Sequence, residues 1–252
     1  MVSKSLILFL SPLLAGLLIY LIPGGRTKNY RLLLVFAGAY LFAITVMHIL
    51  PELYVQAGNV KFIGLFVLAG FFLQQILEYF TSGVEHGHMH VAHVHDDHHH
   101  HHGNGISALV LLSALCMHAF LEGSMLAQPQ QMGPTYDVNA VLLGIVLHRA
   151  PAAFALMTVL SIQLGGRTKA IPHLVAFSLA APLGLFISNY FVEQQIISET
   201  GLIWLYALVC GNFLHISTTI VFESSPEHSF NARKLSVAIL GALVAVVVEY
   251  IL

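Results

Sequence analysis

Hydrophobic residues along the chain fall into eight long, nearly continuous stretches that are separated by more polar segments. Each stretch approaches the ~20 residues that an α-helix needs to cross the ~30 Å hydrocarbon core of a bilayer. The apolar residues are continuous rather than alternating, which favours helices over barrel strands. We therefore expect an all-α, polytopic membrane protein, one transmembrane domain over 1–252, with eight transmembrane helices at about residues 5–22, 31–50, 62–80, 106–127, 139–162, 171–191, 202–222 and 235–251.

The composition supports a membrane protein. Of the 252 residues, 57% are hydrophobic and 9% are charged, whereas a soluble domain carries roughly 25% charged residues. So few charges cannot cover a water-facing surface, which excludes an ordinary soluble enzyme and a disordered chain. The net charge of −2 provides no basic face, so we expect a lipid bilayer and no nucleic acid as partner. Cys116 and Cys210 lie in apolar stretches and indicate no disulfide framework.

The distribution of cations predicts the orientation. If the N-terminus is outside, the inner segments hold seven of the ten Lys and Arg residues, and the outer segments hold two. This bias favours both termini outside, in a plasma (inner) membrane. Lys4 alone precedes the first stretch, and Arg26, Lys28 and Arg31 follow it. A secretory signal has its cations first, so we expect 5–22 to be a retained span.

A histidine-rich segment separates the third and fourth stretches. Imidazoles, together with Asp96 and Asp97, suit zinc and other first-row divalent ions. We expect residues 81–105 to form a disordered cytosolic loop that binds metal weakly, as such tracts do by composition. A solvated linker or an inserted tag is the alternative, although a position between two spans argues against a tag. The loop histidines are His86, His88, His90, His93, His95, His98, His99, His100, His101 and His102.

Ionisable residues deep in the apolar stretches are expensive and usually functional. His118 and Glu122 are spaced i, i+4 and so lie on one helix face, while His148 and Arg149 belong to the next stretch. His118 and His148 each lie nine residues from the outer end of their stretch, or ~14 Å, near the midplane. A short outer loop joins these stretches, so the two imidazoles and the carboxylate can converge. Two histidines and a glutamate with an open position form a recognised zinc ligand set.

A buried ion pair is the competing interpretation of these residues. Arg149 needs a partner in lipid, and Glu122 is the acid that we place deepest in the core. The two could pair without binding metal, with each histidine satisfied by backbone carbonyls. Both interpretations hold together if Glu122 bridges the metal and the guanidinium.

Two further polar positions are weaker candidates. His48, with Glu52 one turn later, ends the second stretch and could form an entrance site or simply a hydrated helix end. His215 in the seventh stretch could be a further metal ligand or a core histidine.

At these residues the chain resembles the ZIP (Zrt/Irt-like) family of metal transporters. His118 to Gly123 (His-Ala-Phe-Leu-Glu-Gly) is similar to the family's His-Asn-x-Pro-Glu-Gly, and His148 to Ala152 to its His-acidic-x-Pro-Glu/His. His48 to Glu52 is similar to His-Leu-Leu-Pro-Glu, and Ala181 to Gly184 to Glu-Pro-Leu-Gly. The resemblance covers nearly the whole chain and implies a ZIP-like bundle, with a homodimer as the assembly.

The departures from the family pattern affect one half of its two-metal centre. His118, Glu122 and His148 match one site, whereas ligands of the other are replaced by Ala119, Arg149, Ala152 and Ala181, and the span-four proline is Leu121. Losing these acids makes a second dication costly at this depth. We hypothesise that Arg149 supplies a fixed positive charge where the second metal would lie.

The resemblance implies that the protein moves a divalent metal ion into the cytosol by alternating exposure of the midplane site. Zinc suits the ligands best, and cadmium, cobalt, nickel, iron or manganese could also bind. A non-transporting metal-binding or sensing protein is the alternative, because an arginine in the path could block a cation. An intramembrane zinc hydrolase is the third class, but no additional acid is evident as a general base, so we expect no enzyme.

Overall fold

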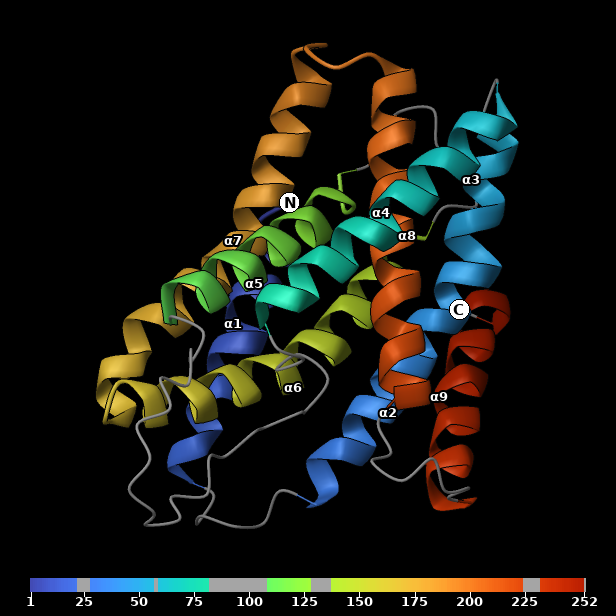
Figure 1. The fold of residues 1–252 in the computed structure, drawn as a ribbon. Coiled ribbons are helices and arrows are strands. Elements are labelled where there is room, and N and C mark those ends of the chain that lie inside the picture. Colours follow the sequence, from blue (N-terminus) through green and yellow to red (C-terminus); the bar gives the residue numbers. More distant parts are fainter. Residues whose placement is uncertain (22–27, 57–58, 82–107, 128–136, 224–231, 252) are drawn as a thin grey trace.

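The computed structural model describes residues 1–21, 28–56, 59–81, 108–127, 137–223 and 232–251, and every regular element within them is helical (Figure 1). The elements in chain order are α1 (Val2–Leu17), η1 (Leu18–Tyr20), α2 (Lys28–Ile44), η2 (Thr45–Ile49), α3 (Leu50–Gln56), α4 (Val60–Thr81), α5 (Ala108–Ser124), α6 (Val138–Gln163), α7 (Arg167–Glu193), α8 (Glu199–Glu223) and α9 (Ala232–Ile251). The all-α prediction is confirmed.

Within the described residues, these elements form eight helical units, because η1 extends α1 and α2, η2 and α3 run on from one another. Six units are long and apolar enough to cross a membrane: Val2–Tyr20, Leu32–Gln56, Val60–Phe80, Val138–Gln163, Arg167–Glu193 and Glu199–Val221. The shorter helix α5 is also apolar, and α9 has 20 residues. The units coincide with the eight expected stretches to within a few residues at most ends.

The second unit is interrupted by one turn of π-helix, η2, that contains His48. Pro51 follows two residues after this turn. A proline has no N–H to offer the carbonyl four residues earlier, here that of Met47, and its ring crowds that carbonyl. A π-turn is one way in which a helix accommodates such a break, and it re-aims the side chains around it. The helix therefore continues past Pro51 to Gln56 instead of ending near residue 50.

The helices pack as two sets. One set contains α1, α5, α6 and α7, and the other contains α2, α4, α8 and α9, while α2 against α6 and α4 against α5 join the sets. Close approach depends on small residues: a Cβ at Gly123 of α5 would collide with the Ala181 carbonyl of α7, and one at Gly70 of α4 with the Leu208 carbonyl of α8. Small residues at crossings are typical of membrane helices, which associate through van der Waals packing.

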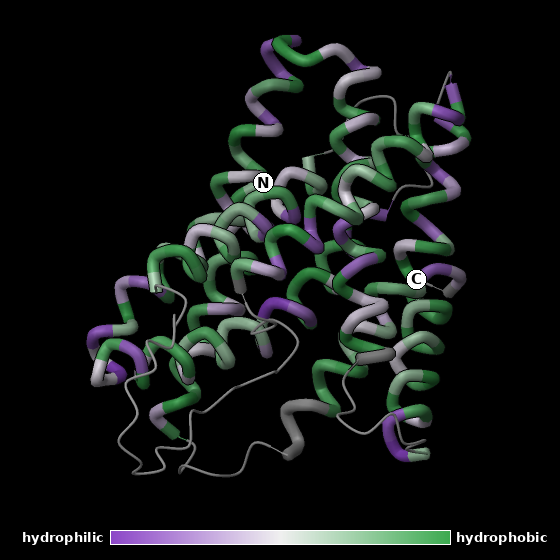
Figure 2. Tube along the Cα trace, in the orientation of Figure 1, coloured by the Kyte–Doolittle hydropathy of each residue, from purple (hydrophilic) through white to green (hydrophobic). Residues whose placement is uncertain are grey.

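The distribution of polarity suits a lipid environment. Hydrophobic residues cover most of the length of the helices, and hydrophilic residues gather near several helix ends (Figure 2). Large apolar side chains are exposed along the outside of α1, α4, α7 and α9, whereas several charged and polar side chains, Glu122 and Arg149 among them, are buried. This is the reverse of a water-soluble surface, on which a large contiguous apolar area is rare. Examples of the exposed residues are Leu6, Leu10, Leu14, Leu65, Leu68, Phe72, Leu183, Phe186, Leu243 and Val247.

Contacts at the helix ends show which helix termini lie on the same side of the bundle. At one end, His48 contacts Glu249 of α9 and the amide of Asp137, the N-cap of α6. At the other end, the Arg167 guanidinium at the start of α7 lies 5.9 Å from the centroid of the Tyr20 ring, where the first unit ends. Both contacts agree with helices that run in alternating directions across the membrane.

Candidate metal centre

Helix α5 supplies two of the three candidate ligands. His118 and Glu122 are one turn apart, and Nε2 of His118 lies 3.1 Å from Oε1 of Glu122. Both residues are buried, with 2% and 0% of their surface exposed. The i, i+4 spacing alone brings the imidazole and the carboxylate together, as the sequence predicts.

Helix α6 supplies the third candidate ligand from across the helix contact. Nε2 of His148 lies 3.9 Å from the same oxygen of Glu122, and the two imidazole rings are 5.9 Å apart between centroids and nearly perpendicular, at 86°. Ligand atoms of the three residues all lie within 4.8 Å of one another. In a tetrahedral zinc site with ~2.1 Å bonds, ligand atoms are roughly 3.4 Å apart. The contacts to Glu122 lie on either side of that value, so small side-chain adjustments can enclose one ion.

Arg149 borders this cluster on the side of the second carboxylate oxygen. Its Nε lies 3.9 Å from Oε2 of Glu122, and 1% of the residue is exposed. Its Nη2 donates a 2.9 Å hydrogen bond to the Phe177 carbonyl of α7, and the guanidinium carbon lies 4.8 Å above the Phe177 ring. Nε and Nη1 make no hydrogen bond within the described part of the chain. The arginine is thus held by α7 and supplies positive charge next to Glu122.

The close crossing of α5 and α7 helps to set the position of the cluster. Gly123 directly follows Glu122 and packs on the backbone of Ala181, while Gly184 packs on the carbonyl of Phe120. The two glycines let the helix backbones meet beside the ligands. Pro151, three residues after His148, removes one backbone donor from α6 at this level.

The structure places the other predicted site residues elsewhere. Nδ1 of His48 lies 2.9 Å from Oε1 of Glu249, and Nε2 of His48 accepts a 2.9 Å hydrogen bond from the Asp137 amide. Glu52 accepts a hydrogen bond from the side chain of Gln56. His215 of α8 lies against Glu78 of α4, 3.5 Å between Nδ1 and Oε2, on different helices from the cluster. The histidine-rich loop and its ten histidines lie outside the described residues.

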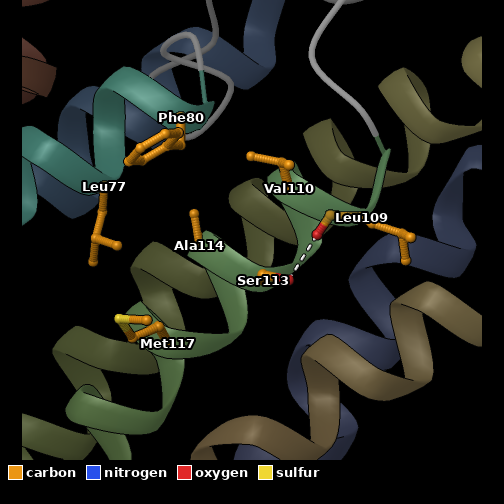
Figure 3. Close-up of a pocket in the computed structure, with 7 residues that line it drawn as sticks. All are labelled: Leu77, Phe80, Leu109, Val110, Ser113, Ala114 and Met117. Carbon is orange, nitrogen blue, oxygen red and sulfur yellow. Dashed lines mark hydrogen bonds between the residues drawn. The ribbon is translucent and has the colours of Figure 1, made fainter.

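An apolar cavity of about 330 Å³ opens between the end of α4 and the first half of α5 (Figure 3). It lies where the two helix sets meet, and Met117, the neighbour of His118, reaches it. Its one hydroxyl, Ser113, donates to the Leu109 carbonyl. The lining therefore offers no metal ligand and suits hydrocarbon: Leu77, Phe80, Leu109, Val110, Ser113, Ala114 and Met117.

Several polar residues that lie buried or half-buried between helices are not among the predicted site residues. Glu78 faces His215, Glu249 faces His48, and Gln74 and Asn212 have 0% and 1% of their surface exposed. For four of these residues the sequence contains a signal in their helical spacing. Gln74 and Glu78 are four residues apart, and Asn212 and His215 are three residues apart. Each pair therefore shares a helix face.

The fold and the cluster define an integral membrane protein with buried candidate metal ligands. Residues 81–249 match the family model described as "ZIP Zinc transporter". This match covers more than half of the chain, and the chain belongs to the ZIP family. The matched range includes the cluster and excludes His48 and Glu52.

Individual relatives agree with the family assignment. Zinc transporter ZIP9-A of Xenopus laevis is 30% identical over 167 residues, 64% of this chain and 52% of that protein. Zinc transporter ZIP9 of Macaca fascicularis is 33% identical over 114 residues, 42% of this chain and 47% of that protein. The ZIP9 of Micropogonias undulatus is 28% identical over 137 residues, 52% of this chain and 44% of that protein. The chain spans about half the length of the curated relatives that it matches.

Proposed function

We propose that this protein carries a divalent metal ion, zinc foremost, across the membrane through a mononuclear site formed by His118, Glu122 and His148. The observation that carries the proposal is the convergence of three buried side chains, from two helices, whose ligand atoms lie within 4.8 Å of one another. Intramembrane ionisable residues are costly, and those that are present usually mark an ion pathway or another functional site. Membership of a family described as zinc transporters supports the same function.

The ligand chemistry favours zinc. Two imidazole nitrogens and one carboxylate oxygen are borderline donors that zinc accepts, and three protein ligands leave a fourth position for water. An open position lets an incoming or departing ligand exchange, which a carrier requires. Cadmium, cobalt, nickel, iron and manganese are further candidates for this donor set.

The charges around the site favour a single ion. Glu122 contributes one negative charge, and the Arg149 guanidinium, 3.9 Å away, partly neutralises it. Ala119, Ala152 and Ala181 offer no side-chain ligands where the family pattern has them. A second dication would therefore add its charge next to the buried guanidinium without an acid to offset it.

The direction of transport that we propose is from outside to cytosol. Both termini lie outside in this arrangement, in a plasma (inner) membrane, because Arg167, Lys169, Arg233 and Lys234 then lie on the inner side. The contact between Arg167 and Tyr20 supports a common side for the ends of the first unit and α7. An impermeant thiol reagent that labels Gln56→Cys, but not Gly166→Cys, in intact cells is the expected result.

Metal uptake into sealed vesicles tests the function. We expect vesicles with the wild-type protein to accumulate zinc, and His148→Ala and Glu122→Gln to lower the initial rate at least tenfold. His173→Ala is the matched control, because His173 is a histidine of α7 that is not part of the cluster. Equal rates in the wild type and both cluster variants would contradict the proposed path.

A protein that binds metal without transporting it is the second candidate. The observation that favours it is the Arg149 guanidinium beside the cluster, where a fixed cation opposes passage of another. The same vesicles distinguish the two candidates. Zinc binding that requires His118, without any uptake above empty vesicles, would favour binding or sensing over transport.

A further inference from the structure

A second polar cluster lies between α4 and α8, in the helix set that does not hold the His118 cluster. Nδ1 of His215 lies 3.5 Å from Oε2 of Glu78. The side chain of His215 is 6% exposed and that of Glu78 is 20% exposed. The Phe71 ring meets the imidazole edge to face, 4.7 Å between centroids, and so fixes its orientation.

Two carboxamides lie at the same level of these helices. Phe66 stacks on Trp204, and Gly70 packs on the Leu208 carbonyl one turn further along both helices. Glu78 contacts His215 about two turns beyond that. Since the contacts advance together, α4 and α8 run in the same direction, which brings Gln74 and Glu78 to the level of Asn212 and His215. Gln74 shares a face with Glu78, and Asn212 shares a face with His215, by their spacings of four and three residues.

Asn212 is a polar side chain buried between the helices. It is 1% exposed, and neither its Nδ2 nor its Oδ1 makes a hydrogen bond to any residue that the structure describes. Burying an amide in this state carries a desolvation cost that no hydrogen bond offsets. A cation coordinated by the amide oxygen would offset that cost.

The separation of His215 and Glu78 also fits an intervening ion. At 3.5 Å, the nitrogen and oxygen are further apart than the 2.7–3.2 Å that is usual for an N–H···O hydrogen bond. Two ligands of one tetrahedral cation, with bonds of ~2.1 Å, are roughly 3.4 Å apart. An imidazole, a carboxylate and amide oxygens together form a mixed nitrogen and oxygen set that first-row divalent ions accept.

We infer that Glu78 and His215, with Asn212 and Gln74 as amide-oxygen ligands, form a second binding site for a first-row divalent cation between α4 and α8. Glu78 supplies one negative charge to the ion and His215 its nitrogen donor. The site lies on different helices from His118, Glu122 and His148, so the two sites bind independently. This inference concerns binding and does not rest on the proposed transport.

Counting zinc ions per chain tests the inference. The full chain is purified with its ten loop histidines replaced by glutamine, so that the loop does not contribute, and then dialysed against zinc. We expect two ions per chain in this parent. Glu78→Gln and His215→Gln should each retain one ion, and His118→Ala should also retain one. His173→Gln is the matched control and should retain two.

The ion at the His118 centre serves as the folding check, because a variant that keeps it is folded. If either substitution unfolds the protein and both ions are lost, Asn212→Ala replaces it and should lower the affinity of the second ion at least tenfold. If every ion bound by the parent, whether one or two, is retained in both Glu78→Gln and His215→Gln, the inference is overturned. Two ions without vesicle uptake would count against transport and leave this second site intact.

Discussion

Arg149 and the two histidines approach different oxygens of the Glu122 carboxylate: Nε of the arginine lies 3.9 Å from Oε2, whereas Oε1 faces His118 and His148. Glu122 is thus shared between a fixed cation and the candidate metal position. Opposite charges ~4 Å apart attract by about 4 kcal/mol at an effective dielectric constant near 20, so the arginine competes with a metal ion for the carboxylate.

Removing this charge should therefore strengthen metal binding. We expect Arg149→Gln to bind zinc at the cluster at least tenfold more tightly than the wild type, measured by competition with a chelator. If Glu122 and Arg149 form only a structural ion pair, the substitution will lower the melting temperature and leave zinc affinity unchanged. His173→Gln controls for non-specific effects of a substitution in a membrane helix.

Reversing the charge should restore capacity for a second ion at the centre. Arg149→Glu places a carboxylate beside Glu122 and removes the guanidinium. We expect this variant to bind one more zinc ion per chain than the parent with its loop histidines replaced, counted by elemental analysis. The idea that arginine stands in for a metal fails if the wild-type centre itself holds two ions, or if Arg149→Glu adds none.

Zinc binding should weaken in acid because both imidazoles must be neutral to coordinate. An ordinary histidine titrates near pH 6.5, so protons compete below that value and the bound state is favoured above it. We expect the zinc affinity of the cluster to fall roughly tenfold or more from pH 7.5 to pH 5. Initial uptake at subsaturating zinc should fall with it, and equally fast transport at the two pH values would contradict this ligand set.

The contact of α5 with α7 should tolerate no added methyl group. A Cβ at Gly123 would collide with the Ala181 backbone, which cannot move as a flexible side chain can. We expect Gly123→Ala to destabilise the protein by about 1–3 kcal/mol and lower its melting temperature in detergent. Gly64→Ala in α4 is the matched control, since its nearest neighbour is a tyrosine hydroxyl at 3.9 Å. Equal melting temperatures would show that the crossing is looser than described.

His48 joins three helices at the opposite end from Tyr20, and its loss should be structural. Its ring contacts Glu249 of α9 and accepts the Asp137 amide at the start of α6. We expect His48→Leu to lower stability by about 1–3 kcal/mol, because a part-buried acceptor and a part-buried donor lose their partner. An entrance role predicts instead a higher KM for zinc uptake at unchanged melting temperature.

The membrane helices could be predicted from sequence because lipid requires long apolar runs, which are visible without any tertiary knowledge. The end of the second unit could not, since Pro51 ordinarily ends a helix and here a π-turn absorbs it. His118 and Glu122 could be paired from their spacing. His148 could be added because its expected depth in the membrane matches that of His118. Pairs such as His48 with Glu249, 201 residues apart, depend on helix packing that no local pattern encodes.

The distribution of His118, Glu122 and His148 over α5 and α6 alone has a mechanical consequence. Both helices belong to the same set, so a rigid shift of that set past α2, α4, α8 and α9 would leave all three ligand separations unchanged. A captive ion could then be uncovered on either face of the bilayer while its coordination stays whole.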